Sequence, residues 1–357
     1  MTSIFFQKPH TRKPLSRIYI DANLYTNPED IYSNIPDYFS LIPPKKRSKP
    51  LYKPSSLSSV YNLRSRTIKE PPSPKPYNPS YVPEYITEIL SYYLKIDEDT
   101  KPLFGYMDKQ TEINMKMRAI LIDWLVDVHL KFKLTPETLY ITVNLIDKYL
   151  SLSTIPRVKL QLLGITCLFI SCKYEEIYPP ELKDHVYITD QTYSKEEIIK
   201  MEDDILRKLN FELTFPTSLR YLEIFTEIMK EKENSKEDNK DNNPNNNDVF
   251  LFSRYLLELC LVEYAMLKYT NGEIALSAYY ISYKIKNEII NGCSLERIAK
   301  VFDYDKGRIK DCSKDICTIL DNSESYWLQA VKKKFSSEQY MNVANWKKYL
   351  YFKSNTK

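Results

Sequence analysis

Glycine and histidine are scarce in this chain, and their placement excludes several kinds of catalytic site. The 357 residues contain five glycines, each standing singly, so no glycine-rich phosphate loop or dinucleotide-binding fingerprint is possible. The three histidines, His10, His129 and His185, are far apart and lack the spacing of zinc ligands. We therefore expect neither a metal site nor a cofactor.

Catalytic signatures are also missing. The sequence has no protein-kinase catalytic loop, no metal-binding Asp-Phe-Gly and no Gly-x-Ser-x-Gly elbow. Carboxylate pairs such as Glu175–Glu176 and Glu196–Glu197 are more often helix surface than acid–base machinery. A divergent enzyme is the less favoured alternative, because no nucleophile or acid–base constellation is recognisable. We expect a protein that is not an enzyme.

Cysteine pairs and long apolar runs are absent too. None of the six cysteines forms a Cys-x-x-Cys pair and no signal peptide is visible, which predicts reduced thiols in an intracellular protein. No apolar run reaches the roughly 18 residues expected of a membrane helix. The sequence therefore predicts a soluble protein without a membrane partner.

Positive charge gathers at the N-terminal end. Residues 1–80 hold 13 Lys or Arg and 5 Asp or Glu, a net +8, so a chain of +4 leaves −4 for the rest. A basic tail is compatible with nucleic-acid binding. However, the segment is rich in proline and serine and lacks helix or strand periodicity, which favours a disordered regulatory arm without a nucleic-acid partner. Its basic cluster at Lys45–Lys49 has the pattern of a nuclear-import signal, and a solvated charge run explains it equally well.

Helical periodicity begins near residue 81 and continues to about residue 209. A short amphipathic helix comes first, and five helices joined by short connections follow, without a convincing strand. Thr135 and Ser194 are helix-capping residues, and Glu197 completes a capping box with Ser194. The predicted helices are Glu84–Leu94, Lys116–Phe132, Pro136–Leu150, Arg157–Tyr174, Glu181–Tyr187 and one from Ser194 to about Leu209.

A second helical set follows, interrupted by an Asn-rich insertion that is too polar to order itself. Its predicted helices are Ser218–Lys230, Val249–Tyr264, Glu273–Ile290, Leu295–Phe302 and Lys306–Leu320, with a further short helix near Tyr326 to Phe335. The predicted fold is all-α, with two five-helix units in tandem. The predicted domains are a disordered tail (1–80), a first unit with its preceding helix (81–213), a second unit (214–322) containing the insertion (231–248), and a C-terminal tail (323–357).

The helix over Lys116–Phe132 is apolar almost all the way round, which is typical of a helix buried inside a larger protein. It nevertheless carries Arg118, Asp123 and Asp127. A charge on a mostly buried helix is costly unless it is paired. Arg118 therefore needs an acidic partner from elsewhere in the chain.

Several blocks in the first unit resemble the cyclin box in their order and spacing. The blocks are Met117–Val126, Leu145–Leu150, Lys159–Gly164, Lys173–Pro180, Tyr187–Asp190 and Lys200–Glu202. His129–Phe132 is more similar to the B-type mitotic cyclins than to the A-type. In the second unit the resemblance is weaker and rests on the fold, because the Asn-rich insertion and Tyr269–Gly272 depart from the family pattern.

The resemblance implies a regulatory subunit that binds and activates a cyclin-dependent serine/threonine kinase by positioning the kinase's αC helix, and that controls progression from G2 into mitosis. The resemblance also implies that Arg118 pairs with Asp147. A guanidinium group can form two parallel hydrogen bonds to one carboxylate, so the pairing is physically reasonable. Lys173 and Glu202 are expected to hydrogen-bond backbone groups of the kinase helix, although Lys and Glu are also commonplace surface charges. The apolar positions expected to pack on the kinase are Ile170, Tyr174, Phe211 and Leu213.

The resemblance also implies a docking groove for Arg-x-Leu motifs of substrates or inhibitors. Four of its positions fall on one stripe of the Lys116–Phe132 helix, and such a stripe normally indicates core packing. Because the whole family pattern is present, we expect the groove. Its residues are Met117, Ile120, Leu121, Trp124, Asp127 and Gln161.

In the tail, Arg12, Leu15 and Ile18 resemble the destruction box of mitotic cyclins, which a ubiquitin ligase reads. Lys232-Glu233-Asn234 spells a second degradation motif, for which coincidence in a Lys/Glu/Asn-rich loop is an equally good explanation. The resemblance implies a location in the nucleus and the cytoplasm. A cyclin-fold transcription adaptor is the alternative function, since the basic tail favours it while Lys173 and Glu202 do not.

Overall fold

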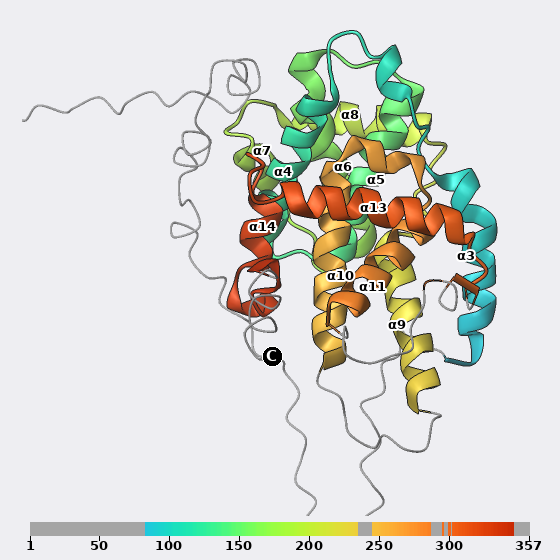
Figure 1. Cartoon of the computed structure of the whole chain (residues 1–357). Helices are drawn as coiled ribbons and strands as arrows, with labels where there is room; N and C mark the ends of the chain where they lie inside the picture. The colour runs from blue at the N-terminus through green and yellow to red at the C-terminus, as the bar shows by residue number, and fades with distance from the viewer. Residues whose placement is uncertain (1–82, 235–244, 287–294, 296–298, 301, 346–357) are drawn as a thin grey trace, which may run out of the picture.

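The computed structural model describes residues 83–234, 245–286, 295, 299–300 and 302–345 (Figure 1). Every regular element in these ranges is a helix, which confirms the predicted all-α fold. The predicted disordered tail, most of the Asn-rich insertion, most of the Leu295–Phe302 helix and the last residues of the chain lie outside the described ranges.

The first domain begins with α3 (Ile86–Thr100) and continues with five further helices. These are α4 (Met115–Phe132), α5 (Pro136–Leu152), α6 (Leu160–Glu175), α7 (Leu182–Ile188) and α8 (Lys195–Lys208). Their ends lie within two residues of the predicted ends, except that Arg157–Lys159 is a 3₁₀ turn before α6.

Helix α3 runs six residues beyond its predicted end at Leu94. The last turns of α3 are mostly polar, so the pattern of apolar residues does not predict that the helix continues past Leu94. The structure supplies the reason, because Asp97 is buried and accepts hydrogen bonds from the backbone N–H groups of Asn271 (3.4 Å) and Gly272 (2.9 Å) in the second domain. The end of α3 is therefore held by a distant part of the chain.

Local sequence explains several helix ends. The Asn114 side chain accepts a hydrogen bond from the Met117 N–H at the start of α4, at 3.0 Å. The predicted capping box at α8 is confirmed, since the side chains of Ser194 and Glu197 each accept a hydrogen bond from the other's backbone N–H. These contacts satisfy N–H groups that have no partner inside the helix.

Among the described residues, the second domain contains the helices α9 (Ser218–Asn234), α10 (Asn245–Val262), α11 (Asn271–Lys286), α13 (Lys306–Asn322) and α14 (Ala330–Phe335). Its core does not end at residue 322, where we expected a tail to begin. Ala330, Val331 and Phe335 of α14 are buried in it, as are Val343 and Ala344. In Figure 1, α14 lies beside α4 at the edge of the molecule.

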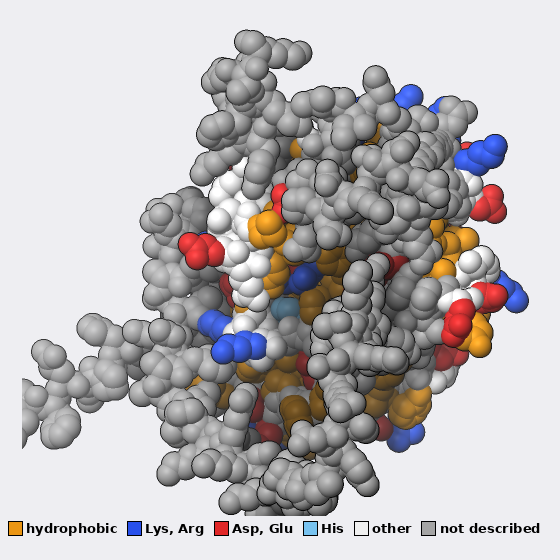
Figure 2. Space-filling model, turned by 90° about the horizontal axis from the view of Figure 1, so that it is seen from below, with side chains coloured by type: hydrophobic (Ala, Val, Ile, Leu, Met, Phe, Trp, Pro, Cys, Tyr) orange, Lys and Arg blue, Asp and Glu red, His pale blue; other side chains and the backbone are white. Residues whose placement is uncertain are grey.

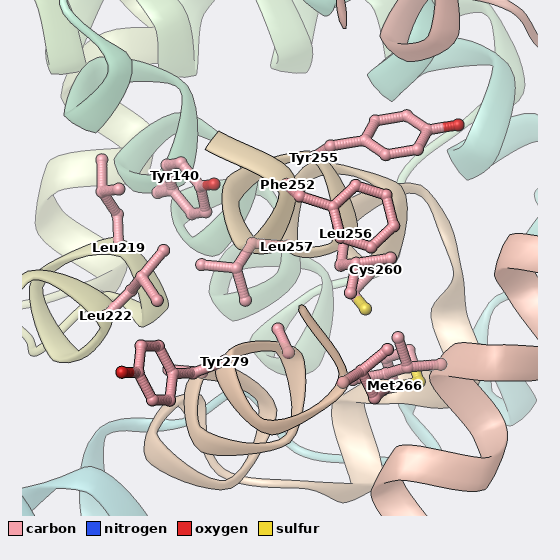
Figure 3. Close-up of a cluster of buried hydrophobic side chains, with 14 of the residues drawn as sticks. Tyr140, Leu219, Leu222, Phe252, Tyr255, Leu256, Leu257, Cys260, Met266 and Tyr279 are labelled. Carbon is pink, nitrogen blue, oxygen red and sulfur yellow. The ribbon is translucent and has the colours of Figure 1, made fainter. Parts of the chain in front are cut away.

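Two hydrophobic cores meet at α4. Leu121, Trp124 and Leu125 belong to the core of the first domain. Ala119, Ile122 and Val126 belong to the second, which also contains Tyr140 of α5 and many residues of α9, α10 and α11. Figure 3 shows this second core, with Tyr140 beside Leu219, Leu222 and Leu257. The all-round apolarity of α4 thus reflects burial on two faces.

The packing of α4 against α6 is close enough to require a glycine. A Cβ added to Gly164 would lie 2.6 Å from Cδ1 of Leu121, which is itself fully buried.

Seen from below, charged side chains of the described residues stand mainly at the rim and hydrophobic ones mainly in the recessed middle (Figure 2). Among the described residues, no helix combines the length and the apolarity needed to cross a membrane.

Candidate functional site

Arg118 and Asp147 form the predicted ion pair. Nε of Arg118 lies 2.6 Å from Oδ1 of Asp147 and Nη2 lies 2.7 Å from Oδ2, and both side chains are 1% exposed. Nη1 donates to the carbonyl oxygens of Leu261 (3.1 Å) and Val262 (3.2 Å), at the end of α10. The Tyr106 hydroxyl donates to Asp147 at 2.7 Å. The pair is therefore confirmed, and it joins the two domains.

Lys173 and Glu202 lie at the surface and form an ion pair with each other. Lys173 is in the last turn of α6 and Glu202 is in the middle of α8, and these two helices pack side by side. The Lys173 side chain is 43% exposed, and its ammonium lies 4.3 Å from the centre of the Phe169 ring. The structure thus brings together the two charges that the sequence singles out.

Large apolar side chains are exposed at the C-terminal ends of these two helices and in the residues that follow them. Tyr174 is 48% exposed and donates or accepts a hydrogen bond with the Thr214 hydroxyl at 2.8 Å. Phe211 is 66% exposed and has a left-handed backbone (φ 60°), which is uncommon for a bulky residue. Ile177 and Tyr178 are 86% and 91% exposed. We refer to six residues as the α6–α8 surface: Lys173, Tyr174, Ile177, Tyr178, Glu202 and Phe211.

Two predicted members of this surface are less exposed than expected. Ile170 is only 2% exposed and belongs to the core of the first domain, because it points inward from α6. Leu213 is partly buried against the same core. Conversely, Ile177 and Tyr178 were not among the predicted contact residues. The sequence signal for them is the following Pro179-Pro180, because residues before proline are biased away from helix and these two lie beyond the end of α6.

The predicted docking groove is mostly closed in this structure. Met117, Trp124 and Gln161 are at most 9% exposed, and Leu121 is fully buried beneath Gly164 of α6. Leu121 therefore belongs to the core rather than to an open surface. The two partly exposed residues of the set are Ile120 and Asp127, and the groove itself stays a prediction.

Two groups in this region have unusual surroundings. Burial raises the pKa of Asp127, while the cations Lys131 and Lys333 oppose the shift. Gln161 is buried, and neither polar atom of its amide has a hydrogen-bond partner in the part of the chain that the structure describes. Buried amide groups normally have partners, so the unpartnered amide of Gln161 is unusual.

The degradation and localisation motifs fall outside this description. Arg12, Leu15, Ile18 and the basic cluster Lys45–Lys49 precede the first described residue. The side chains of Lys232-Glu233-Asn234, at the end of α9, are also outside it.

Comparison with known families gives matches over both domains. The model of the cyclin N-terminal domain matches residues 88–214, and the model of the cyclin C-terminal domain matches residues 216–349. The second match extends past residue 322, in agreement with the buried residues of α14. A viral cyclin from herpesvirus saimiri, solved by X-ray crystallography, has the same fold, with a TM-score of 0.56 at 16% identity over 68% of this chain and 99% of that chain.

The relatives are cyclins of animals and other organisms. The G2/mitotic-specific cyclin-B of Marthasterias glacialis is 38% identical over 75% of this chain and 64% of its own length. That of Spisula solidissima is 35% identical over 89% and 65%, and Cyclin-A2 of Gallus gallus is 36% identical over 75% and 64%. The chain thus spans just under two thirds of the length of these relatives. With both family domains present in tandem, the chain belongs to the cyclin family, and G2/mitotic B-type cyclins are among its relatives.

Proposed function

We propose that this chain is the regulatory subunit of a cyclin-dependent serine/threonine kinase, and that the α6–α8 surface binds the kinase. The observation that carries the proposal is the Lys173–Glu202 pair between α6 and α8, together with the exposed side chains of Tyr174, Ile177 and Phe211 at or just after the ends of these helices. Exposed apolar side chains that gather beside polar ones mark protein–protein contact sites. Aromatic residues in such places are frequent binding hot spots.

The two charges suit a helix backbone as their partner. The Lys173 ammonium offers only donors and the Glu202 carboxylate only acceptors. In the complex, Lys173 donates to backbone carbonyl groups of the kinase αC helix and Glu202 accepts from its amides. In the free chain they satisfy each other. The Lys173 side chain is 43% exposed, so water screens the pair and exchanging it for kinase groups costs little.

The mechanism is a shift in the population of kinase conformations. An isolated kinase of this class keeps its αC helix turned away, so its Lys–Glu ion pair does not form and its phosphate-binding geometry is incomplete. A rigid surface that binds only the turned-in helix shifts the equilibrium by its difference in affinity for the two states. The chain contributes no group to the phosphates and acts as a non-catalytic activator.

The names of the relatives suggest when this happens. Those of Marthasterias glacialis and Spisula solidissima are described as G2/mitotic-specific. We carry this timing over as part of the proposal, so that the chain acts at the transition from G2 to mitosis. The tail motif at Arg12, Leu15 and Ile18 then directs a ubiquitin ligase to the chain, and the chain is present in the nucleus and the cytoplasm.

Substrate docking at α4 is a second element of the proposal. Partly exposed Ile120 and Asp127 lie on α4, and the unpartnered amide of Gln161 lies at the start of α6. An Arg-x-Leu peptide supplies an arginine for Asp127, an apolar side chain for Ile120 and backbone groups for Gln161. Such docking selects substrates without touching the chemistry of the kinase.

Co-purification with a cyclin-dependent kinase, followed by a kinase assay, tests the main proposal. The variant Lys173→Ala/Glu202→Ala is expected to lose kinase capture and activation. The matched control is Asp203→Ala/Arg207→Ala, which removes an exposed ion pair with a 2.8 Å contact from the same helix, α8. Undiminished capture by the first variant, or equal loss by both, would contradict the proposed surface.

A further inference from the structure

The turn that follows α6 is tied to the start of α5 by one carboxylate. Oε1 of Glu176 accepts hydrogen bonds from the Thr135 N–H at 2.8 Å, the Thr135 hydroxyl at 3.0 Å and the Thr138 hydroxyl at 2.6 Å. Thr135 is the residue before α5 and makes no capping bond to its own helix with its side chain. The Glu176 side chain therefore acts as a cap at the N-terminal end of α5, although it belongs to the turn after α6.

A second link reaches the same turn from the other domain. Oε1 of Glu175 lies 3.5 Å from Nη2 of Arg220 in α9. Arg220 also lies 2.9 Å from Glu223 and 3.8 Å from Glu137. At these distances the Glu175 contact is weaker than the hydrogen bonds of Glu176, whose Oε1 accepts from three donors at 2.6–3.0 Å.

These links matter because of what comes next in the chain. Ile177 and Tyr178 are the most exposed large apolar side chains among the described residues, at 86% and 91%. Almost no packing holds them. Pro179 and Pro180 follow and donate no backbone hydrogen bond. The side chain of Glu176 is thus the principal polar anchor immediately before the two exposed residues.

We propose that Glu176 is a positioning residue, which holds Ile177 and Tyr178 in the orientation that the kinase binds. This inference rests on the proposed function, because it names a group that prepares the α6–α8 surface. The physical reason is preorganisation, since a turn already fixed in the free protein loses less conformational freedom on association. Glu176 touches Thr135 and Thr138 rather than the kinase.

The first measurement uses the free full-length chain and needs no kinase. Hydrogen–deuterium exchange is followed at the amides of residues 176–178 in wild type, Glu176→Ala and Asp305→Ala. Asp305 is the matched control, because its carboxylate accepts a hydrogen bond from the Arg308 N–H (2.8 Å) at the start of α13 in the second domain. Glu176→Ala is expected to speed exchange in the turn, whereas Asp305→Ala leaves it unchanged. Unchanged exchange in Glu176→Ala would overturn the inference.

The second measurement is the dissociation constant of the complex with the kinase. Glu176→Ala is expected to weaken binding about tenfold, because a turn that is no longer fixed in the free chain must be ordered on association. Glu176→Gln keeps an acceptor oxygen and is expected to recover part of the loss. Asp305→Ala, with a similar loss of a helix cap, is expected to bind like wild type.

A double-mutant cycle separates positioning from a merely structural role. Ile177→Ala/Tyr178→Ala is expected to weaken binding strongly in the wild-type chain and only slightly when Glu176→Ala is already present, because residues that act together are non-additive. Additive losses would overturn the inference while leaving the proposed function intact. If Lys173→Ala/Glu202→Ala binds the kinase like wild type, the proposed function fails, and the exchange measurement still decides whether Glu176 fixes the turn.

Discussion

Lys334 and Glu258 form an ion pair that has no contact with solvent. The Lys334 ammonium donates to both carboxylate oxygens of Glu258, at 2.8 and 2.7 Å, and both side chains are 0% exposed. Lys334 is in α14 and Glu258 is in α10, so the pair fixes α14 to the rest of the second domain. Arg254, one turn away on α10, lies 3.6 Å from the same carboxylate.

Lys334→Ala is expected to lower the free energy of unfolding by about 3–5 kcal/mol, because it leaves the Glu258 charge buried without its main partner. Denaturant unfolding measures the change. Lys314→Ala, which removes a lysine that is 65% exposed on α13, is the control and should stay within about 0.5 kcal/mol of wild type. A double replacement with apolar residues, Lys334→Met/Glu258→Leu, should recover much of the loss. Equal stability of Lys334→Ala and Lys314→Ala would contradict the importance of the buried pair.

Arg118→Lys is expected to destabilise the chain although it keeps the positive charge. A lysine ammonium cannot make the two parallel hydrogen bonds to Asp147 and also reach the carbonyl groups of α10. We expect losses of about 3–5 kcal/mol for Arg118→Ala or Asp147→Ala and a smaller loss for Arg118→Lys. Thermal unfolding gives the order of the variants. A melting temperature for Arg118→Ala equal to that of wild type would refute the prediction.

Glu137→Gln is expected to change how stability depends on pH. Burial raises the pKa of Glu137 from 4.5 to about 7, against the opposing effects of the Thr217 hydrogen bond and Arg220. Because the folded pKa lies above the unfolded one, the stabilisation from protonated Glu137 is complete below pH 4.5 and is lost as the pH rises through about 7.

Across that window wild type should therefore lose about 1.4 kcal/mol per pH unit relative to Glu137→Gln. Unfolding free energies of both proteins at several pH values measure the difference, which reports Glu137 together with its electrostatic coupling to Glu175 and Glu223. Parallel curves for the two proteins would show that the carboxyl titrates normally.

Asp127→Asn, combined with Ile120→Ala, should reduce phosphorylation of Arg-x-Leu substrates about tenfold while leaving simple peptide substrates unchanged, because one charge pair and one apolar contact are lost. These positions are preferred to Met117 and Trp124, which are 5% and 9% exposed and whose truncation would damage the core. The measurement is the ratio of kcat/KM for the two substrates. An equal decrease for both would point to damage to the fold rather than to a lost docking site.

The helices of the first domain could be predicted from the sequence because capping residues and proline mark their ends. Ser194 with Glu197 and Pro136 are local signals, and they were sufficient to place the starts of α8 and α5. The extension of α3 to Thr100 could not be predicted in this way. It depends on Asp97 meeting backbone N–H groups of residues 271 and 272, and such a distant contact leaves no periodic pattern.

The candidate site was predicted to a different extent in its two parts. The pairing of Arg118 with Asp147 followed from a buried charge and the family pattern, and the structure confirms it. The stripe on α4 could not be assigned by spacing, since a groove and a core have the same helical period. Only the burial of Leu121 under Gly164 in the structure shows that this residue belongs to the core and not to an open groove.

The division of α4 between two cores has a consequence for how the protein folds. Ala119, Ile122 and Val126 pack in the core of the second domain. Nη1 of Arg118 donates to carbonyl oxygens of the same domain. A first domain released from the second would expose an apolar helix face together with a guanidinium nitrogen that has lost its acceptors. We therefore expect the two domains to unfold together as one cooperative unit rather than as two independent modules.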